Sequence, residues 1–341
     1  MKNVGDTLKN TNFKQFFMEN TALVTLILLV IVATIIMGTT FLNINNLMNV
    51  MFNNAIVGII ALGMTIIIIS GGIDLSVGSA TAMIGLVALT TINATGSIII
   101  GVLAAFGAGI VMGAFNGILI SRFRIPAFIA TLGAMIIFRS LSLNFWQGGG
   151  MLLGRFGGIV LDIDVMGFLA FSNTRLFTNL FQVGLPLPVL YWIALTILMT
   201  LLCKRTALGR HIYAVGSNER AANLSGVKVK NVKVYVYMIA GALVAFAALV
   251  EASRLGSMNS ATSGNMYELQ AIAAVVIGGT AMSGGRGRPA NTFFGALTLG
   301  VINNVMNLFG VSGFLVGAVQ GTVLLLAVLL QRSIVKSEKA Y

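Results

Sequence analysis

Long apolar runs alternate with short polar links over most of this chain. Each run approaches the roughly 20 residues that an α-helix needs to cross the hydrocarbon core of a bilayer, so each predicts a membrane-spanning helix. The predicted spans cover residues 21–38, 50–70, 77–92, 97–120, 127–146, 188–203, 234–252, 269–282, 290–308 and 314–330. We therefore expect an all-α polytopic membrane protein of about ten transmembrane helices, built from residues 21–330.

Glycine-rich stretches follow two of these spans, at residues 71–78 and 278–285. Glycine turns the chain without a steric penalty, and irregular backbone at membrane depth is tolerated where protein buries it. We therefore expect broken or re-entrant helices at both stretches. They share the pattern Gly-Gly-x-x-Leu/Met-Ser-x-Gly, which is consistent with an internal repeat of the kind common in transporters. In the fourth span, a face for close helix packing is predicted at Gly101, Gly107, Gly109 and Gly113.

Composition supports a membrane environment. The 341 residues are 57% hydrophobic and 9% charged, whereas a soluble domain has about a quarter charged residues. The formal net charge of +12 does not indicate a nucleic-acid partner, because the basic residues flank apolar runs instead of forming one stripe with aromatics. One His and one Cys provide neither a metal site nor a nucleophile–base pair. The G-x-x-x-x-G-K-[ST] phosphate loop is also missing, so we expect a non-enzyme with no cofactor of its own.

The distribution of basic residues predicts the orientation. Loops rich in Lys and Arg stay on the cytoplasmic side, and the ten-span arrangement puts nearly all of the 21 Lys and Arg residues on one side. The four exceptions are Arg139, Arg155, Arg175 and Arg254. We expect a multi-pass protein of the cell inner membrane, in contact with membrane lipid, with a cytoplasmic N-terminal segment (1–20) and a cytoplasmic tail (331–341). The polar segment 147–187 should then cover the outer face.

The longest basic loop, residues 204–233, carries seven Lys and Arg residues. Its centre predicts a short helix over 218–226, with Ser217 as the N-cap, Glu219 in the first turn and Gly226 as the stop. Composition leaves two interpretations open for this loop. It is either a solvated basic anchor or a handle that a cytoplasmic partner grips.

Polar side chains inside the apolar runs are costly in a membrane, so they usually face a partner helix or a wet pathway. The candidates for a substrate pathway are Asn54, Asp74, Ser76, Glu268, Gln270, Asn303, Asn304 and Asn307. Carboxamides and hydroxyls can hydrogen-bond sugar hydroxyls without needing a charge. Each candidate could instead make an interhelical hydrogen bond that only holds the bundle together. Asp74 could also cap the helix that restarts after the first glycine break.

Five sets of motifs follow one another along nearly the whole chain. They are Ala61-Leu62-Gly63-Met64 with residues 71–78, Ile125-Pro126-Ala127-Phe128-Ile129 with Thr131-Leu132-Gly133, residues 209–226, residues 267–274 and Gly284-Gly285-Arg286-Gly287-Arg288. This series resembles the permease subunits of bacterial ABC importers for monosaccharides, of the ribose and galactose type. The family commonly has an Asp where Gln270 stands, so the resemblance specifies the family better than the sugar.

The resemblance implies partners for this chain. They are a second permease copy in a homodimer, a periplasmic or lipid-anchored sugar-binding protein outside, and a separate ATPase inside that uses ATP and Mg. It also implies that the basic loop couples the permease to the ATPase, through Glu219, Arg220, Ala221, Ala222, Leu224 and Gly226. Here Arg220 is inserted into the family pattern of an acidic residue, two alanines and a glycine. The implied function is translocation of a monosaccharide, ribose-like first and galactose-like second.

Two other functions remain open from the sequence. An ion-coupled secondary transporter or channel for a small polar solute would usually bury carboxylates at mid-membrane, whereas most carboxylates here lie near the ends of the predicted spans. The other alternative is the same permease role for a nucleoside or an autoinducer, because selection of the solute is expected to rest with the binding protein.

Overall fold

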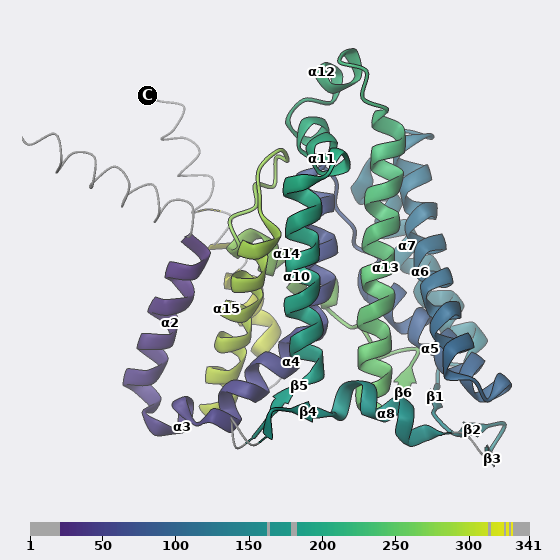
Figure 1. Cartoon of the computed structure of the whole chain (residues 1–341), viewed down its shortest axis with the longest axis vertical. Helices are drawn as coiled ribbons and strands as arrows, with labels where there is room; N and C mark the ends of the chain where they lie inside the picture. Colours follow the sequence, from purple (N-terminus) through teal and green to yellow (C-terminus); the bar gives the residue numbers. More distant parts are fainter. Residues whose placement is uncertain are drawn as a thin grey trace, which may run out of the picture.

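The computed structural model describes residues 21–161, 164–178, 183–312, 315–323, 325, 326 and 329. In this part of the chain, long helices stand side by side and short strands gather at one end (Figure 1). We call that end, which carries helix α8 (Val165–Asn173), the α8 end. The opposite end carries helix α12 (Glu219–Leu224) and is called the α12 end. The expected cytoplasmic segment 1–20 and tail 331–341 lie outside the described residues.

The first nine predicted spans each coincide with a helix. In chain order these helices are α2 (Thr21–Met37), α4 (Ile44–Ile69), α5 (Val77–Thr95), α6 (Ile98–Ser121), α7 (Ala127–Phe145), α10 (Leu187–Arg205), α13 (Val229–Leu255), α14 (Tyr267–Ile277) and α15 (Pro289–Leu308). The tenth span, 314–330, falls partly outside the described residues, and within it residues 315–323 are helical. The shorter helices are α3 (Thr39–Leu42), α8, α11 (Ala207–Ser217) and α12.

Six helices in the described part are long and apolar enough to cross a membrane, namely α4, α5, α6, α7, α10 and α13. Helix α2 is apolar but has 17 residues, and α15 has 20 residues but carries several asparagines. Helix α14 has only 11 residues, which is about 16 Å at ~1.5 Å per residue. That length cannot cross a hydrocarbon core of about 30 Å. The structure is therefore a polytopic, mostly helical membrane protein, in which the expected span 269–282 is a shorter, broken helix.

Two helices begin earlier than expected. Helix α4 starts at Ile44, with the Asn43 side chain accepting a hydrogen bond of 2.9 Å from the Asn45 amide, whereas the predicted span begins at residue 50. Helix α13 starts at Val229 within the basic loop. In both cases polar helical turns extend the apolar run, because hydropathy marks where a helix is apolar and not where its backbone becomes helical.

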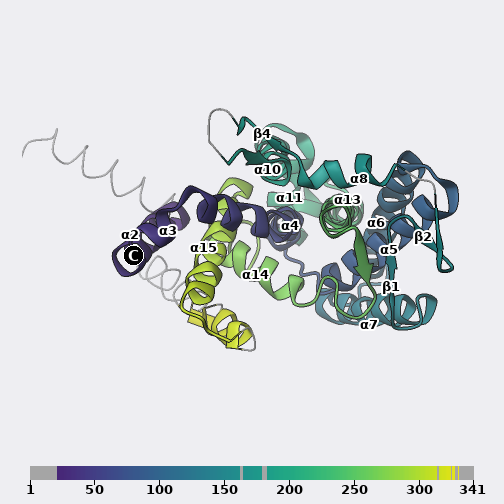
Figure 2. The ribbon, with the colours of Figure 1, turned by 90° about the horizontal axis from the view of Figure 1, so that it is seen from below.

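Helix α4 lies in the middle of the bundle, as the view from the α8 end shows (Figure 2). In its most apolar stretch 83% of the residues are buried by the chain itself, against 28% for α6, α7 and α10. Trp192 of α10 is fully buried against α4, because Gly58 leaves room for its ring. The peripheral helices therefore keep apolar faces free for lipid or for another protein, while α4 is the core of this chain.

Helices α6 and α13 approach so closely that backbone meets backbone. A Cβ atom placed on Gly113 would lie 2.2 Å from the carbonyl oxygen of Tyr237, and one on Gly109 would lie 2.4 Å from that of Gly241. Small residues permit this approach in membrane helices. Gly107 has no atom within 4 Å of the equivalent position, so the expectation that it shares this packing face is wrong.

The two glycine breaks have the same backbone geometry. The amides of residues 70, 71 and 72 after α4 donate to carbonyl oxygens four, three and five residues back in the chain. The amides of residues 278, 279 and 280 after α14 do the same. Gly71 and Gly279 occupy the middle position, with left-handed φ angles of 83° and 79°. This is the Schellman helix end, in which glycine avoids the strain of a positive φ angle. The ends of α7, α12 and α15 have the same three bonds, so this geometry does not by itself establish an internal repeat. Within it, Gly71 corresponds to Gly279, one position later than the sequence motif suggests.

The segment expected on the outer face, 147–187, lies at the α8 end and does not span the bundle (Figure 1). Its strands are β1 (Gly150–Leu152), β2 (Arg155–Phe156), β3 (Ile159–Val160), β4 (Arg175–Leu176) and β5 (Leu185–Pro186). Strands β2 and β3 pair with each other, as do β4 and β5, all antiparallel. Strand β1 pairs with β6 (Ser257–Asn259), with Met151 opposite Met258. This last pairing ties the segment to the loop between α13 and α14.

The contact between α6 and α13 predicts which glycine matters for stability. We expect Gly113→Ala to lower the free energy of unfolding by about 1–3 kcal/mol, because the added methyl overlaps backbone that cannot rotate away. Gly107→Ala on the same helix is the matched control and should be neutral or slightly stabilising. Loss of the helical circular-dichroism signal on heating in detergent measures both. Equal destabilisation by the two variants would contradict the packing described.

Candidate functional site

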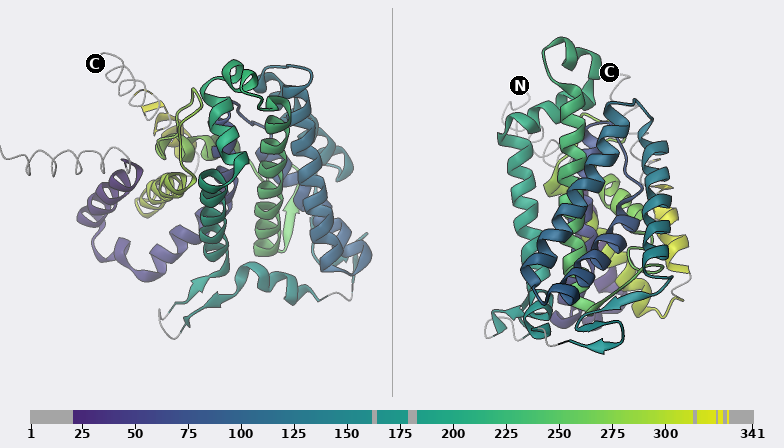
Figure 3. Two further views of the ribbon diagram at one scale, coloured as in Figure 1. Left: turned by 45° about the horizontal axis from the view of Figure 1, so that its top comes forward. Right: turned by 90° about the vertical axis from the view of Figure 1, so that its right-hand side faces the viewer.

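Two short helices form a projection at the α12 end, between α10 and α13 (Figure 3). Helix α11 begins after Thr206, whose hydroxyl accepts a hydrogen bond of 3.0 Å from the Gly209 amide. Helix α12 begins after Asn218, whose side chain accepts one of 3.0 Å from the Ala221 amide. Such side chains pair the free amides of a first helical turn. The expected short helix is therefore present, but its N-cap is Asn218, and Ser217 is instead the last residue of α11.

The tip of this projection presents its side chains outward. Of the expected coupling residues, Glu219, Arg220, Ala221, Leu224 and Gly226 are exposed, and Ala222 alone is buried. Leu224 is 88% exposed. Gly226 ends the helix as expected, with a φ angle of 84°. An exposed leucine on a protruding helix is suited to contact with another protein.

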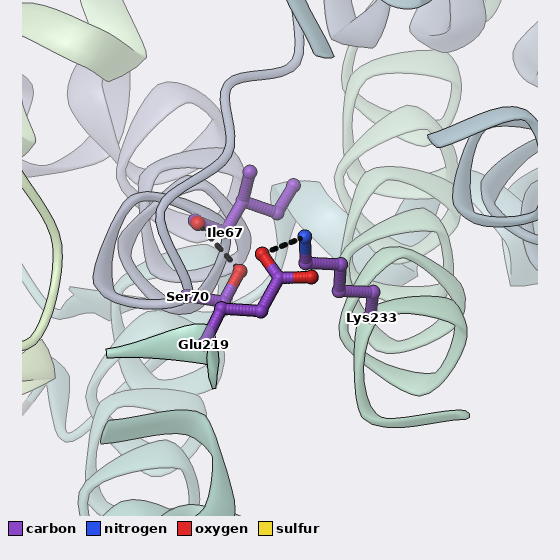
Figure 4. Close-up of polar contacts among 4 residues, drawn as sticks. All are labelled: Ile67, Ser70, Glu219 and Lys233. Atoms are coloured by element: carbon purple, nitrogen blue, oxygen red, sulfur yellow. Dashed lines mark hydrogen bonds and ion pairs between the residues drawn. The ribbon is translucent and has the colours of Figure 1, made fainter. Parts of the chain in front are cut away.

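An ion pair holds α12 against α13. The Lys233 ammonium lies 2.7 Å from Oε2 of Glu219 (Figure 4). Beside it, the buried Ser70 hydroxyl donates to the carbonyl oxygen of Ile67 at 2.7 Å. A partly exposed pair of this kind contributes about 0–1 kcal/mol to stability. Its effect is therefore to orient α12 on α13, more than to stabilise the fold.

The end of α11 meets both glycine breaks at one backbone oxygen. The Gly285 amide donates to the carbonyl oxygen of Ile69 at 2.8 Å. A Cβ atom on Gly216 would lie 1.7 Å from that oxygen, and one on Gly284 would lie 3.2 Å from the Cα atom of Gly71. We call this contact of Ile69, Gly71, Gly216, Gly284 and Gly285 the glycine junction. Because backbone touches backbone, a displacement of α11 is passed directly to both breaks.

Tyr213 adds a second connection between α11 and the second break. Its hydroxyl donates to the carbonyl oxygen of Gly287 at 2.7 Å. Burial, together with the nearby Cys203, raises the pKa of Tyr213 to about 12, although Arg288 opposes the shift. The phenol therefore stays protonated at physiological pH and remains a hydrogen-bond donor.

A cleft of about 650 Å³ opens beside α12, between the first glycine break, the turn from α6 to α7 and the start of α13. We call it the α12 cleft. Its charged lining residues are Arg124, Glu219, Arg220, Lys230 and Lys233. The cleft therefore combines an open shape with an excess of positive charge.

Two pathway candidates, Asp74 and Ser76, form a buried cluster with Asn116 of α6. One carboxylate oxygen of Asp74 accepts from the Ser76 hydroxyl at 2.6 Å and from the Ser76 amide at 2.8 Å. Asn116 donates to the Ser76 hydroxyl at 2.8 Å. The N-cap position of α5 belongs to Ser76, so Asp74 forms a turn ahead of the helix and the expected capping role is corrected. Sequence inspection missed Asn116, although it is the one asparagine in an otherwise apolar run.

Four further candidates lie where α4 and the tenth-span helix pack on α15. The Asn54 amide bonds the Val50 carbonyl oxygen at 2.7 Å and its side chain packs on Gly300. Asn304 and Asn46 exchange two hydrogen bonds, of 2.9 and 2.7 Å. Asn303 accepts one of 3.0 Å from Gln320, and Asn307 is exposed. Two partners, Asn46 and Gln320, were not among the sequence candidates, and Asn46 lies ahead of the predicted span 50–70.

The remaining candidates, Glu268 and Gln270, lie at the start of α14 and are half-buried. The Glu268 carboxylate packs on Gly78 at the start of α5, so the two helices that border the breaks meet there. Arg139 of α7 attracts Glu268 electrostatically and donates to the carbonyl oxygen of Ser260 at 2.7 Å. Gln270 borders a small cavity of about 40 Å³ with Gln320. In the part of one copy that the structure describes, the eight candidates therefore fall into separate groups.

Long apolar helices, two glycine breaks and an exposed two-helix projection are typical of a multi-pass membrane protein of the permease class. Residues 46–328 match the family described as the permease component of branched-chain amino acid transport systems. The chain belongs to this family.

Several relatives of this chain are named for a sugar. The ribose import permease protein RbsC of Escherichia coli (strain K12) is 37% identical over 318 residues, which are 93% of this chain and 94% of that protein. The L-arabinose transport system permease protein AraH of the same strain is 34% identical over 254 residues, 74% of this chain and 72% of that protein. The xylose transport system permease protein XylH of Haemophilus influenzae is 32% identical over 277 residues, 68% of this chain and 74% of that protein. No solved structure matches the chain. The resemblance to monosaccharide permeases is thereby confirmed, and these relatives are transport subunits and not enzymes.

The reciprocal pair of Asn46 and Asn304 predicts a measurable coupling. We expect Asn46→Leu and Asn304→Leu each to destabilise the protein by about 0.5–1.5 kcal/mol, since each leaves a polar partner unpaired in the membrane. The double variant should lose less than the sum of the two. Chemical or thermal unfolding of all three variants in detergent measures the difference. Strictly additive losses would show that the two amides do not interact.

Proposed function

We propose that this chain is the membrane-spanning permease subunit of an ATP-driven importer that moves a monosaccharide, ribose-like before galactose-like. Relatives named for ribose, arabinose and xylose support a sugar. The single observation that carries the coupled mechanism is the glycine junction, which joins an exposed docking helix to both breaks in the membrane domain.

In this proposal the α12 end faces the cytoplasm. The basic residues of the segment 204–233 lie at that end, in keeping with the rule that Lys/Arg-rich loops stay inside. Ten spans would then place both termini inside, and the segment 147–187 would receive an external sugar-binding protein, periplasmic or lipid-anchored. A separate ATPase using ATP and Mg would grip α12, with Leu224 as the apolar anchor between Arg220 and Gly226.

The proposed mechanism uses α11 as a rigid connector. ATP-driven movement of the ATPase displaces α12, and α11 follows because Asn218 is the only residue between the two helices. The junction then shifts the ends of α4 and α14 together. Two bundle states, biased by nucleotide on one side and by the loaded binding protein on the other, give alternating access.

The proposed pathway is completed by a second copy of the chain. Glu268 and Gln270 are half-buried and lie at the broken start of α14, which is the place where transporters commonly bind solutes. With Asn303 and Asn307 they would face the partner copy across the path. Asp74, Ser76, Asn54 and Asn304 make internal hydrogen bonds, which supports a role in keeping that path rigid.

The central test is uptake in proteoliposomes that contain the chain with its ATPase and binding protein. We expect ATP-dependent uptake of ribose, and Gly216→Ala should reduce it at least tenfold, because a methyl group cannot fit against the Ile69 carbonyl. Gly133→Ala, where nothing lies within 4 Å of the added methyl, is the matched control and should keep uptake near the original rate. Size-exclusion chromatography checks that both variants are folded.

Uptake by the chain alone, driven by an ion gradient without the ATPase, would overturn the proposal in favour of an ion-coupled carrier. Full uptake by a folded Gly216→Ala variant would leave the permease class intact but remove the junction from the mechanism.

The ion pair predicts a charge-swap rescue. Glu219→Lys should separate α12 from α13 by repulsion and reduce uptake several-fold while ATP hydrolysis continues. Adding Lys233→Glu restores opposite charges across the same 2.7 Å contact and should recover most of the uptake. Uptake and hydrolysis are measured side by side in the reconstituted complex. Failure of the double variant to recover would mean that Glu219 acts on the ATPase and not on α13.

A further inference from the structure

The α12 cleft holds positive charge that the described residues do not neutralise. Among the four basic residues on its walls, Lys233 pairs with Glu219. Arg124, Arg220 and Lys230 have no ion-pair partner in the described part of the chain. Arg124 also has a left-handed φ angle of 60°, a backbone state that is costly for a residue with a side chain and is concentrated at functional positions.

Ser121 supplies an independent sign of a missing ligand. It is the last residue of α6 and lines the cleft, yet it is only 5% exposed. Its hydroxyl has no hydrogen-bond partner among the described residues. A serine near a helix end usually bonds a carbonyl one turn back, as Ser142 and Ser225 do here. A buried polar group without any partner is uncommon in folded proteins, and an unseen ligand is one of its explanations.

We infer that the α12 cleft binds a phosphate-bearing anion from the cytoplasmic side. Arginine forks and lysine ammonium groups are the usual protein partners of phosphate oxygens, and a hydroxyl completes such a site by donating one more bond. The volume of about 650 Å³ is within the range of sites for small ligands. A neutral sugar does not need three cations, so the site is separate from the proposed transport pathway.

The position of the site means that a bound anion regulates uptake; this step of the inference rests on the proposed function. The cleft walls belong to α12 and α13 on one side and to the turn between α6 and α7 on the other. A phosphate group bridging them resists the displacement of α12 that coupling requires. The bound anion therefore slows ATP-driven uptake from the cytoplasmic face.

Binding is tested on the full chain in nanodiscs of zwitterionic lipid, without the ATPase. Ribose 5-phosphate and inorganic phosphate are the probes, and ribose and sodium chloride at equal ionic strength are the controls. We expect the two phosphate compounds to raise the thermal unfolding midpoint and to give saturable calorimetric binding, with no saturable effect of either control. The variant R124Q/K230Q should weaken this binding at least tenfold.

Two single variants complete the binding test. Arg210→Gln removes a positive charge from α11, at the α12 end of the molecule but outside the cleft lining, so the affinity for phosphate should not change. Ser121→Ala removes a hydroxyl that has no internal partner. It should weaken phosphate binding while leaving the unliganded unfolding midpoint unchanged or higher, which distinguishes a ligand contact from a structural one.

The source of the phosphate group is decided by nanodiscs that contain phosphatidylglycerol. The site is assigned to a lipid headgroup if this lipid raises the thermal unfolding midpoint, and zwitterionic lipid with soluble phosphates does not. The rise should then be lost in R124Q/K230Q. In the reconstituted importer, ribose 5-phosphate inside the vesicles should slow uptake by the unmodified protein several-fold and by R124Q/K230Q hardly at all.

The inference is overturned if Arg210→Gln and R124Q/K230Q lower binding equally, or if sodium chloride reproduces the shift, because the charges then only orient the chain. It is also overturned if neither the phosphate compounds nor the lipid bind. If R124Q/K230Q in addition no longer binds the ATPase subunit, the charges of the cleft serve that contact instead. Failure of uptake in every sample would count against the proposed function, while the binding result would stand by itself.

Discussion

One carbonyl oxygen, that of Ile69, joins the parts of this molecule that must act together. Ile69 is the last residue of α4, the most buried of the six long apolar helices, and its carbonyl oxygen accepts a hydrogen bond from the Gly285 amide of the second glycine break. Gly216 of α11 packs on the same oxygen without room for a methyl group. Side chains can change rotamer and absorb a displacement, but contacting backbone cannot. The exposed projection and the two glycine breaks are therefore rigidly connected and are expected to move together.

The breaks themselves follow from the cost of leaving backbone groups unpaired. The last turn of a helix has carbonyl groups without partners inside the helix. Both breaks solve this with the same Schellman end, at Gly71 and Gly279. The first carbonyl left over, at Ile69, is satisfied by the second break. The Gly285 amide therefore connects the two breaks directly, at the glycine junction.

Buried polar groups divide according to whether the chain satisfies them. Asn46 with Asn304, and Asp74 with Ser76, have their partners within one copy and hold helices in fixed positions. Glu268 and Gln270 are half-buried at the start of α14, where Arg139 attracts the Glu268 carboxylate, and the buried Ser121 hydroxyl has no hydrogen-bond partner among the described residues. An unsatisfied buried polar group costs free energy, which is why the Ser121 hydroxyl supports the proposed ligand site in the α12 cleft.

Hydropathy and charge along the chain determined the helices, their order and which links are basic, since the bilayer imposes an apolar length on every span and a charge bias on every loop. The glycine breaks and the short helix ending at Gly226 were also readable, because left-handed turns require glycine. What the sequence did not determine was proximity. Nothing in it joins Gly216 to Ile69, Asn116 to Ser76 or Asn46 to Asn304. It aligned Gly71 with Gly278 instead of Gly279, and it put Gly107 on a packing face that it does not share. Those relations depend on how separate helices approach one another, and that distance is set by side-chain volume at contacts between residues far apart in the chain.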